Sequence, residues 1–209
     1  TTKKREDDKI INIAKKNKVS FFRGADQDVL KRMIFALKKI KKIASVVRIT
    51  GDDIMVDPAY IDKSIAEHNK INADYTSSKS LPSGTESEVF NYRVLKLIFH
   101  ISEDSSGSEY LTNYIIDNQS FFKINETKIN KKHKLNYRLT IDTAEDFLLV
   151  KKILEHMKKI NKPYNYTIDD IKKFFIKFPK FIKINKGALQ KKMPISFSTK
   201  LDWTKNEKD

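Results

Sequence analysis

The chain has 209 residues, of which 39% are hydrophobic and 11% aromatic, so its composition excludes a disordered chain and allows one sizeable α/β domain. It contains no cysteine, which excludes disulfides and cysteine zinc sites, and no apolar stretch is long enough to cross a bilayer. The net charge of +15 suits an anionic partner, but the lysines are spread along the chain, so we interpret most of them as solvated surface. Because the first eight residues also lack the apolar core of a signal peptide, we expect a cytoplasmic protein that binds neither membrane nor nucleic acid.

The first fifty residues show an alternation of helix and strand patterns. Isoleucines at helical spacing predict a helix over 8–17, and the short apolar run 19–22 predicts a strand. Asp26 is suited to cap a second helix, whose buried face we expect to run from Val29 to Ile40, and 44–50 reads as another strand. The alternation predicts a Rossmann-like α/β fold, with a mostly parallel sheet between helices.

Asp57 and Pro58 form a typical helix start, and we expect that helix to bury Ile61 and Ile65. The polar stretch 72–84 predicts a long loop or an irregular hairpin. Further along the chain, the pattern predicts strands over 88–90 and 137–141, an extended segment over 121–125, and helices over 92–101, 109–117 and 143–159. A last helix follows Tyr166, with its apolar positions on one side, before a polar segment from Lys186 to Asp209.

Two acidic turns follow predicted strands, at the end where open α/β sheets hold their ligands. The first runs from Arg48 through Gly51 to Asp52, and the second runs from Arg138 to Asp142. If the two strands are neighbours, Asp52 and Asp142 can share one Mg²⁺ ion, which prefers a couple of carboxylates together with water and substrate phosphates. The alternative is that 142–145 is only a capping box and 51–53 only a turn, and the spacing leaves both readings open.

Other polar residues carry weaker signals. Arg23, Arg48 and Arg138 are each able to hold a phosphate or carboxylate, or to pair with a neighbouring acid on the surface. Glu86 and Glu88 flank a predicted strand and face either a pocket or solvent. The sequence has no phosphate-binding loop with a Gly-Lys-Ser/Thr ending, no Gly-x-Ser-x-Gly elbow and no Gly-x-Gly-x-x-Gly, so most common enzyme classes lose their signature.

The order of several segments resembles the cytidylyltransferases of the spore coat polysaccharide biosynthesis type, relatives of the CMP-ketodeoxyoctonate and CMP-acylneuraminate synthetases. The most specific of these segments are Val47-Arg48-Ile49-Thr50-Gly51-Asp52 and Leu139-Thr140-Ile141-Asp142-Thr143. The others are 1–2 with 7–10, 22–24 with 28–30, 57–58, 84 with 88–90, and 145–146. The chain departs from the family pattern in having Ile54 in place of a proline and Tyr110 in place of a histidine.

The resemblance implies a magnesium-dependent enzyme that transfers CMP from CTP to an acidic sugar and releases pyrophosphate. It implies that Asp52 and Asp142 are catalytic metal ligands, that Gly51 lies with Asp52 at the cofactor, and that Arg23, Glu88 and Arg138 are candidates for substrate binding. It also implies a cytidylyltransferase-like domain over 1–185, a tail over 186–209, and a homodimer. The family's first strand and basic, glycine-containing loop, followed by a helix and a second strand, would precede Thr1, and together they amount to on the order of 50 residues.

Three alternatives remain from the sequence. A nucleotide-sugar glycosyltransferase has a similar sheet and would use Gly51, Asp52 and Asp53 as its metal motif. A non-catalytic partner would keep the fold without binding CTP. A basic nucleic-acid-binding module predicts a steeply salt-dependent affinity for DNA or RNA.

Overall fold

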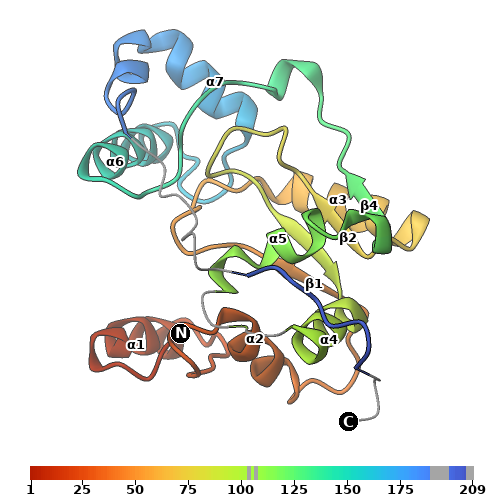
Figure 1. Ribbon diagram of the computed structural model, residues 1–209. Helices are drawn as coiled ribbons and strands as arrows, with labels where there is room; N and C mark the ends of the chain where they lie inside the picture. The colour runs from red at the N-terminus through yellow and green to blue at the C-terminus, as the bar shows by residue number, and fades with distance from the viewer. Residues whose placement is uncertain (103–104, 106–107, 189–197, 206–209) are drawn as a thin grey trace. The chain divides into compact units, whose positions relative to one another are not determined.

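The computed structural model describes residues 1–102, 105, 108–188 and 198–205 (Figure 1). These residues form two compact units. Unit 1 contains residues from 1–46, 90–123 and 192–209, and unit 2 contains residues from 47–89 and 124–191. The boundary between the units passes through two strands of the sheet.

A four-stranded sheet is formed by β1 (Ser45–Arg48), β2 (Tyr75–Ser77), β3 (Glu88–Asn91) and β4 (Ile124–Glu126), in the order β1-β3-β2-β4. Strand β2 pairs with β4 in parallel, with Tyr75 opposite Ile124. The connection from β2 to β3 is shorter than a parallel crossover needs, and the sheet is therefore mixed. The predicted α/β, Rossmann-like fold is confirmed.

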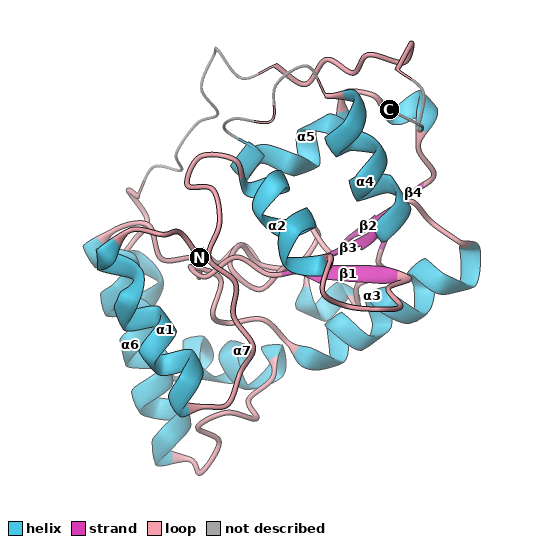
Figure 2. Cartoon of the chain, turned by 90° about the horizontal axis from the view of Figure 1, so that it is seen from below, coloured by secondary structure: helices cyan, strands magenta, loops and turns pink. Residues whose placement is uncertain are grey.

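Unit 1 is built mainly from helices, and α2 packs against α4 (Figure 2). Leu30 and Ile34 of α2 are buried, as are Leu95 and Ile98 of α4. The α-helices are α1 (Asp8–Lys16), α2 (Val29–Leu37), α4 (Tyr92–Ile101) and α5 (Leu111–Ile116), with 3-10 helices η1 (Arg5–Asp7), η2 (Ser108–Tyr110) and η3 (Gln119–Phe121).

Two local predictions in unit 1 are wrong. The run 19–22 forms no strand, because its apolar side chains do not enter the core: Val19 is 59% exposed and Phe21 is 48% exposed. The three apolar residues of this run therefore do not form part of a buried sheet face. The residue that caps α2 is Asp28 rather than Asp26, and its carboxylate accepts a hydrogen bond from Lys31 N at 2.8 Å.

Unit 2 carries the longest helices, and α6 and α7 pack side by side (Figure 1). Its main core joins these helices to Met55 and Leu139, which flank the two acidic turns. The helices are α3 (Pro58–Ile71), α6 (Ala144–Lys159) and α7 (Ile168–Lys177), with 3-10 helices η4 (Lys131–His133) and η5 (Pro179–Lys183). The apolar positions predicted for the last helix are all buried: Ile168, Ile171, Phe174 and Phe175.

The buried residue Asp57 connects two helices of unit 2. One carboxylate oxygen accepts from Ala59 N at 2.9 Å, which caps α3 as predicted, and the other accepts from Ile168 N at 3.1 Å at the start of α7. The face that α3 buries differs from the prediction, because Tyr60, Ser64 and His68 are buried there, whereas Ile61 and Ile65 are only partly buried. The polar side chains on this face can be buried because residues in the surrounding loops form hydrogen bonds with them. For example, Thr127 Oγ1 lies 2.8 Å from Ser64 Oγ.

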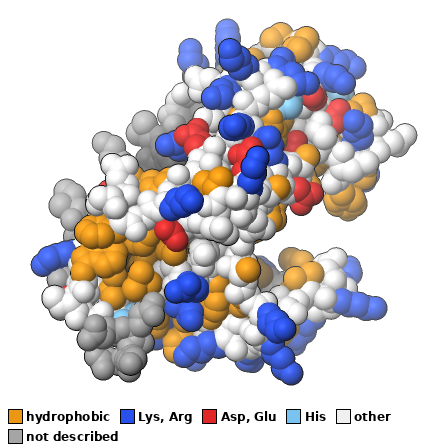
Figure 3. Space-filling view, turned by 90° about the vertical axis from the view of Figure 1, so that its right-hand side faces the viewer, with side chains coloured by type: hydrophobic (Ala, Val, Ile, Leu, Met, Phe, Trp, Pro, Cys, Tyr) orange, Lys and Arg blue, Asp and Glu red, His pale blue; other side chains and the backbone are white. Residues whose placement is uncertain are grey.

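Two further segments of unit 2 differ from the predictions. Residues 137–141 form no strand, because their only ladder contact is an isolated bridge between Arg138 and Ser83, in which Leu139 N donates to Ser83 O at 2.7 Å. The stretch 72–84, predicted as a long loop or an irregular hairpin, contains the strand β2, whose residues are buried on both faces. Lysine and arginine side chains are scattered over the face shown in Figure 3 rather than gathered in one patch.

Candidate functional site

The two acidic turns lie side by side in unit 2. Ile141 N donates a hydrogen bond to Asp52 O at 3.1 Å, so the backbones of the two turns are directly joined. The Asp52 side chain is exposed, and within the described part of the chain it has no hydrogen-bond or ion-pair partner. The neighbouring Gly51 is also exposed, and a Cβ added there would meet no atom within 4 Å.

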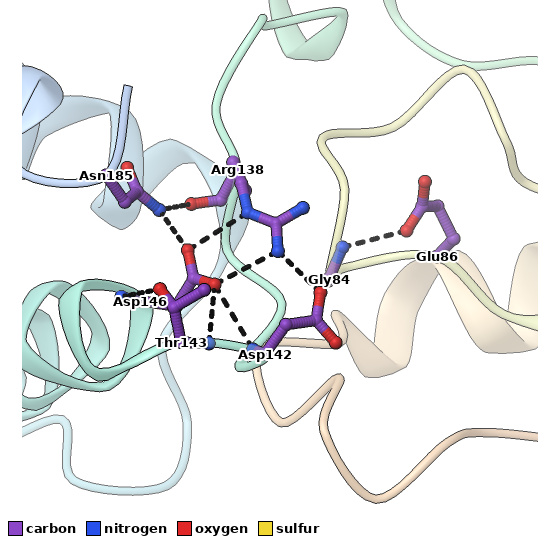
Figure 4. A network of polar contacts seen from close by, with 7 residues as sticks. All are labelled: Gly84, Glu86, Arg138, Asp142, Thr143, Asp146 and Asn185. Atoms are coloured by element: carbon purple, nitrogen blue, oxygen red, sulfur yellow. Dashed lines mark hydrogen bonds and ion pairs between the residues drawn. The ribbon is translucent and has the colours of Figure 1, made fainter. Parts of the chain in front are cut away.

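The Asp142 carboxylate is oriented by an arginine. Arg138 Nη2 donates to Asp142 Oδ2 at 2.5 Å and also to Asp146 Oδ2 at 3.0 Å (Figure 4). Arg138 Nε donates to the other oxygen of Asp146 at 3.0 Å, while Nη1 has no partner among the described residues. Asp142 keeps 32% of its side chain exposed, so its carboxylate remains accessible to a ligand.

Asp146 is the centre of this network and is completely buried. Besides Arg138, its carboxylate accepts from Asn185 Nδ2 at 2.7 Å, from Asp142 N at 3.1 Å and from Thr143 N at 3.0 Å. Burial alone would raise the pKa of Asp146, but the hydrogen bonds from Arg138 and Asn185 outweigh it and lower that pKa to about 2. Asp146 is therefore an anion at neutral pH.

A capping box forms the start of α6, one residue later than the predicted one. Thr143 Oγ1 accepts from Asp146 N at 3.2 Å, and the Asp146 carboxylate accepts from Thr143 N in return. The predicted box of 142–145 is wrong for this reason. Because Thr143 and Asp146 supply the cap, the Asp142 carboxylate is not used for capping.

The loop before β3 packs directly against the second acidic turn. Gly84 has φ of 88°, and a Cβ added to it would lie 2.1 Å from Thr140 N, so only glycine fits. Gly84 N donates to Glu86 Oε2 at 2.8 Å. Burial raises the pKa of Glu86 to about 7 against that hydrogen bond, and the negative charge of Asp53 adds to the increase.

The other predicted substrate-binding residues are held by the protein itself. Glu88 accepts from Arg48 Nη1 at 2.5 Å and from Tyr75 Oη at 2.7 Å, so both its oxygens have partners within unit 2. Arg23 belongs to unit 1. There its guanidinium donates to Thr2 O, Asp8 Oδ1 and Lys4 O, at 2.9, 2.7 and 2.7 Å. The substrate contacts predicted for Arg23, Glu88 and Arg138 stay predictions.

Two residues of the network carried little signal in the sequence. Asp146 stands three residues after Thr143, a Ser/Thr-x-x-Asp/Glu spacing that predicts a helix start. This spacing does not predict that Asp146 is buried or that it accepts several hydrogen bonds. Asn185 also donates to Arg138 O at 2.9 Å, and it lies 39 positions beyond Asp146 in the chain. No local pattern predicts such a partner.

The donor set of the two turns fits a magnesium ion that is shared with a nucleotide. The described residues contain no cluster of three or more Asp, Glu, His or Cys side chains that could enclose a metal. A metal at the two turns would therefore have at most two such ligands among the described residues, and Asp52 and Asp142 are the candidates. One or two carboxylates completed by water and substrate phosphates are the usual protein environment of Mg²⁺.

Comparisons with known proteins show the family of this chain. A family model described as cytidylyltransferase matches residues 1–180. An uncharacterized protein of Methanocaldococcus jannaschii is 34% identical over 192 residues, which are 91% of this chain and 77% of that protein. The spore coat polysaccharide biosynthesis protein SpsF of Bacillus subtilis is 31% identical over 136 residues, which are 64% of this chain and 56% of SpsF.

A solved structure shares the fold. The chain is 28% identical to a cytidylyltransferase from Leptospira borgpetersenii serovar Hardjo-bovis, with a TM-score of 0.78 over 91% of this chain and 79% of that one. The family match and the shared fold thus define a nucleotidyltransferase. The chain belongs to the cytidylyltransferase family. None of the helices that the structure describes has the length and hydropathy to span a membrane.

Proposed function

We propose that this protein transfers CMP from CTP to a hydroxyl group of an acidic sugar, in a magnesium-dependent reaction that releases pyrophosphate. The observation that carries the proposal is the junction of the two acidic turns, which the hydrogen bond from Ile141 N to Asp52 O joins. The name of SpsF, a spore coat polysaccharide biosynthesis protein, supports a role in making a surface polysaccharide. A homodimer remains a prediction.

In this reaction the sugar hydroxyl oxygen bonds to the α-phosphorus of CTP and its proton is released to solvent, while the bond from that phosphorus to the bridging oxygen breaks and pyrophosphate leaves. The magnesium ion would supply positive charge to the phosphates, held by Asp52 and Asp142. Arg138 is the candidate for holding a further anionic group, since its Nη1 is directed away from the two carboxylates that its other nitrogens hold (Figure 4). That group is suited to a phosphate or to the carboxylate of the sugar.

The test is pyrophosphate release from CTP and Mg²⁺ across a panel of acidic sugars. Asp52→Asn and Asp142→Asn should each lower the rate by about 100-fold or more, because each removes a charged ligand from the developing phosphate charge. Asp62→Asn is the matched control, since Asp62 is an exposed aspartate on α3. Its rate should stay within about twofold of the parent rate.

Two results would contradict the proposal. One is Asp52→Asn with the activity of the parent protein, which would remove the metal assignment. The other is release of a nucleoside diphosphate from a sugar nucleotide, without pyrophosphate release from CTP, which would identify a glycosyltransferase.

A further inference from the structure

The buried carboxylate of Asp146 contacts both peptide groups that flank Asp142. It accepts from Asp142 N at 3.1 Å and from Thr143 N at 3.0 Å (Figure 4). These two N–H groups belong to the peptide planes on either side of the Asp142 Cα. A single carboxylate therefore restrains both backbone dihedrals of the residue that is expected to bind the metal.

The same carboxylate also orients the Asp142 side chain, through Arg138. One nitrogen, Nη2, donates to Asp146 Oδ2 at 3.0 Å and to Asp142 Oδ2 at 2.5 Å. Asn185 Nδ2 fixes the opposite side, because it donates to Asp146 Oδ1 at 2.7 Å and to Arg138 O at 2.9 Å. Backbone and side chain of Asp142 are thus both held from one buried group.

Capping α6 does not require this arrangement. A capping box needs one acceptor oxygen at its third position, which an exposed Glu or Gln supplies in many helices. Asp146 instead buries a full negative charge, which is costly unless every oxygen is paired. Both its oxygens are paired, by five donor contacts in all.

We propose that Asp146 is a positioning residue for cytidylyl transfer, which holds Asp142 in its metal-binding orientation without touching the substrate. The proposal rests on the proposed function, since it assigns Asp142 to the metal. Outer partners that orient metal ligands typically contribute 10–100-fold to metal affinity, and Asp146 stands in that relation to Asp142.

Unit 2 contains a matched control at the start of α7. Thr167 and Asp170 form the same capping box, with Asp170 Oδ2 accepting from Thr167 N at 3.0 Å. Asp170 is 5% exposed and is paired with Lys162 Nζ at 2.8 Å. Unlike Asp146, it accepts no hydrogen bond from an acidic turn among the described residues. Asp146→Asn and Asp170→Asn therefore remove comparable capping and ion-pair contacts, and only the first affects Asp142.

The experiment compares the two variants by thermal unfolding, by Mn²⁺ binding and by pyrophosphate release. Mn²⁺ binding is followed by electron paramagnetic resonance with CTP present and no sugar, so that no turnover occurs. Both variants should unfold at a lower temperature than the parent. Asp146→Asn should bind Mn²⁺ about 10–100-fold more weakly than the parent, while the Mn²⁺ affinity of Asp170→Asn should stay within about twofold of the parent affinity. Saturating Mg²⁺ should restore most of the kcat of Asp146→Asn, but not that of Asp142→Asn.

The proposal is overturned if Asp146→Asn binds Mn²⁺ as the parent does, or if Asp170→Asn loses as much affinity. If Asp146→Asn does not fold, Asn185→Ala replaces it. That variant removes one side-chain donor to Asp146 and should weaken Mn²⁺ binding several-fold, and unchanged binding there overturns the proposal. Mn²⁺ binding without pyrophosphate release from CTP would contradict the proposed function alone, whereas a parent protein that binds no Mn²⁺ would overturn both.

Discussion

Replacing Gly84 by alanine should strongly destabilise unit 2. The added Cβ would stand 2.1 Å from Thr140 N and 2.2 Å from Leu139 C, far inside the ordinary van der Waals distance, and both are backbone atoms that no rotamer change can move. The φ of 88° adds a conformational penalty for any residue with a Cβ. The chain can relieve the overlap only by breaking the hydrogen bond from Leu139 N to Ser83 O, at 2.7 Å.

From these terms we expect Gly84→Ala to lower the free energy of unfolding by about 3–6 kcal/mol. For a chain of this size, such a loss lowers the melting temperature by roughly 6–24 °C. Urea titration and thermal unfolding followed by circular dichroism measure the two quantities. The expected loss is large because the added Cβ overlaps with backbone atoms of Leu139 and Thr140. These atoms cannot move away from Gly84 without opening the second acidic turn.

Gly51→Ala is the control for this measurement. Gly51 lies in the first acidic turn, is exposed, and has no atom within 4 Å of the position of an added Cβ. Its substitution should change the free energy of unfolding by about 0.5 kcal/mol or less. The reasoning is refuted if Gly84→Ala and Gly51→Ala unfold within about 1 kcal/mol of each other.

Two further predictions concern buried or partly buried carboxyl groups. Asp57→Ala removes the cap of α3 and the carboxylate that accepts from Ile168 N at the start of α7, and should cost about 2–3 kcal/mol in urea unfolding; a loss below about 1 kcal/mol would show that the contact to Ile168 N contributes little. The pKa of Glu86 is about 7 in the folded state, above its unfolded value, so the stability linked to its protonated form is complete below about pH 4.5 and is lost as the pH rises through 7. The free energy of unfolding of Glu86→Gln, relative to that of the parent, should therefore rise between pH 5 and pH 8 by on the order of 2 kcal/mol after allowance for partial exposure. A difference between the two proteins that does not depend on pH would contradict the raised pKa of Glu86.

Helices were the part of the fold that the sequence predicted best. The helix expected over 92–101 is α4, and the start expected at Asp57 and Pro58 is the start of α3. Both depend on side-chain periodicity and on caps, which act within a few residues. Strands were predicted less well, because 19–22 and 137–141 have strand-like composition but find no continuous partner. Pairing depends on a distant segment, which a local pattern does not contain.

The same division holds for the candidate site. The sequence by itself determined that two acidic turns follow apolar segments, and that Asp52 and Asp142 were the residues to examine. Only the tertiary structure decided that the turns share a backbone hydrogen bond and that Asp146 is a buried anion between Arg138 and Asn185. The physical reason is that a carboxylate can be buried only where all its partners converge, and here one partner, Asn185, comes from a distant part of the chain.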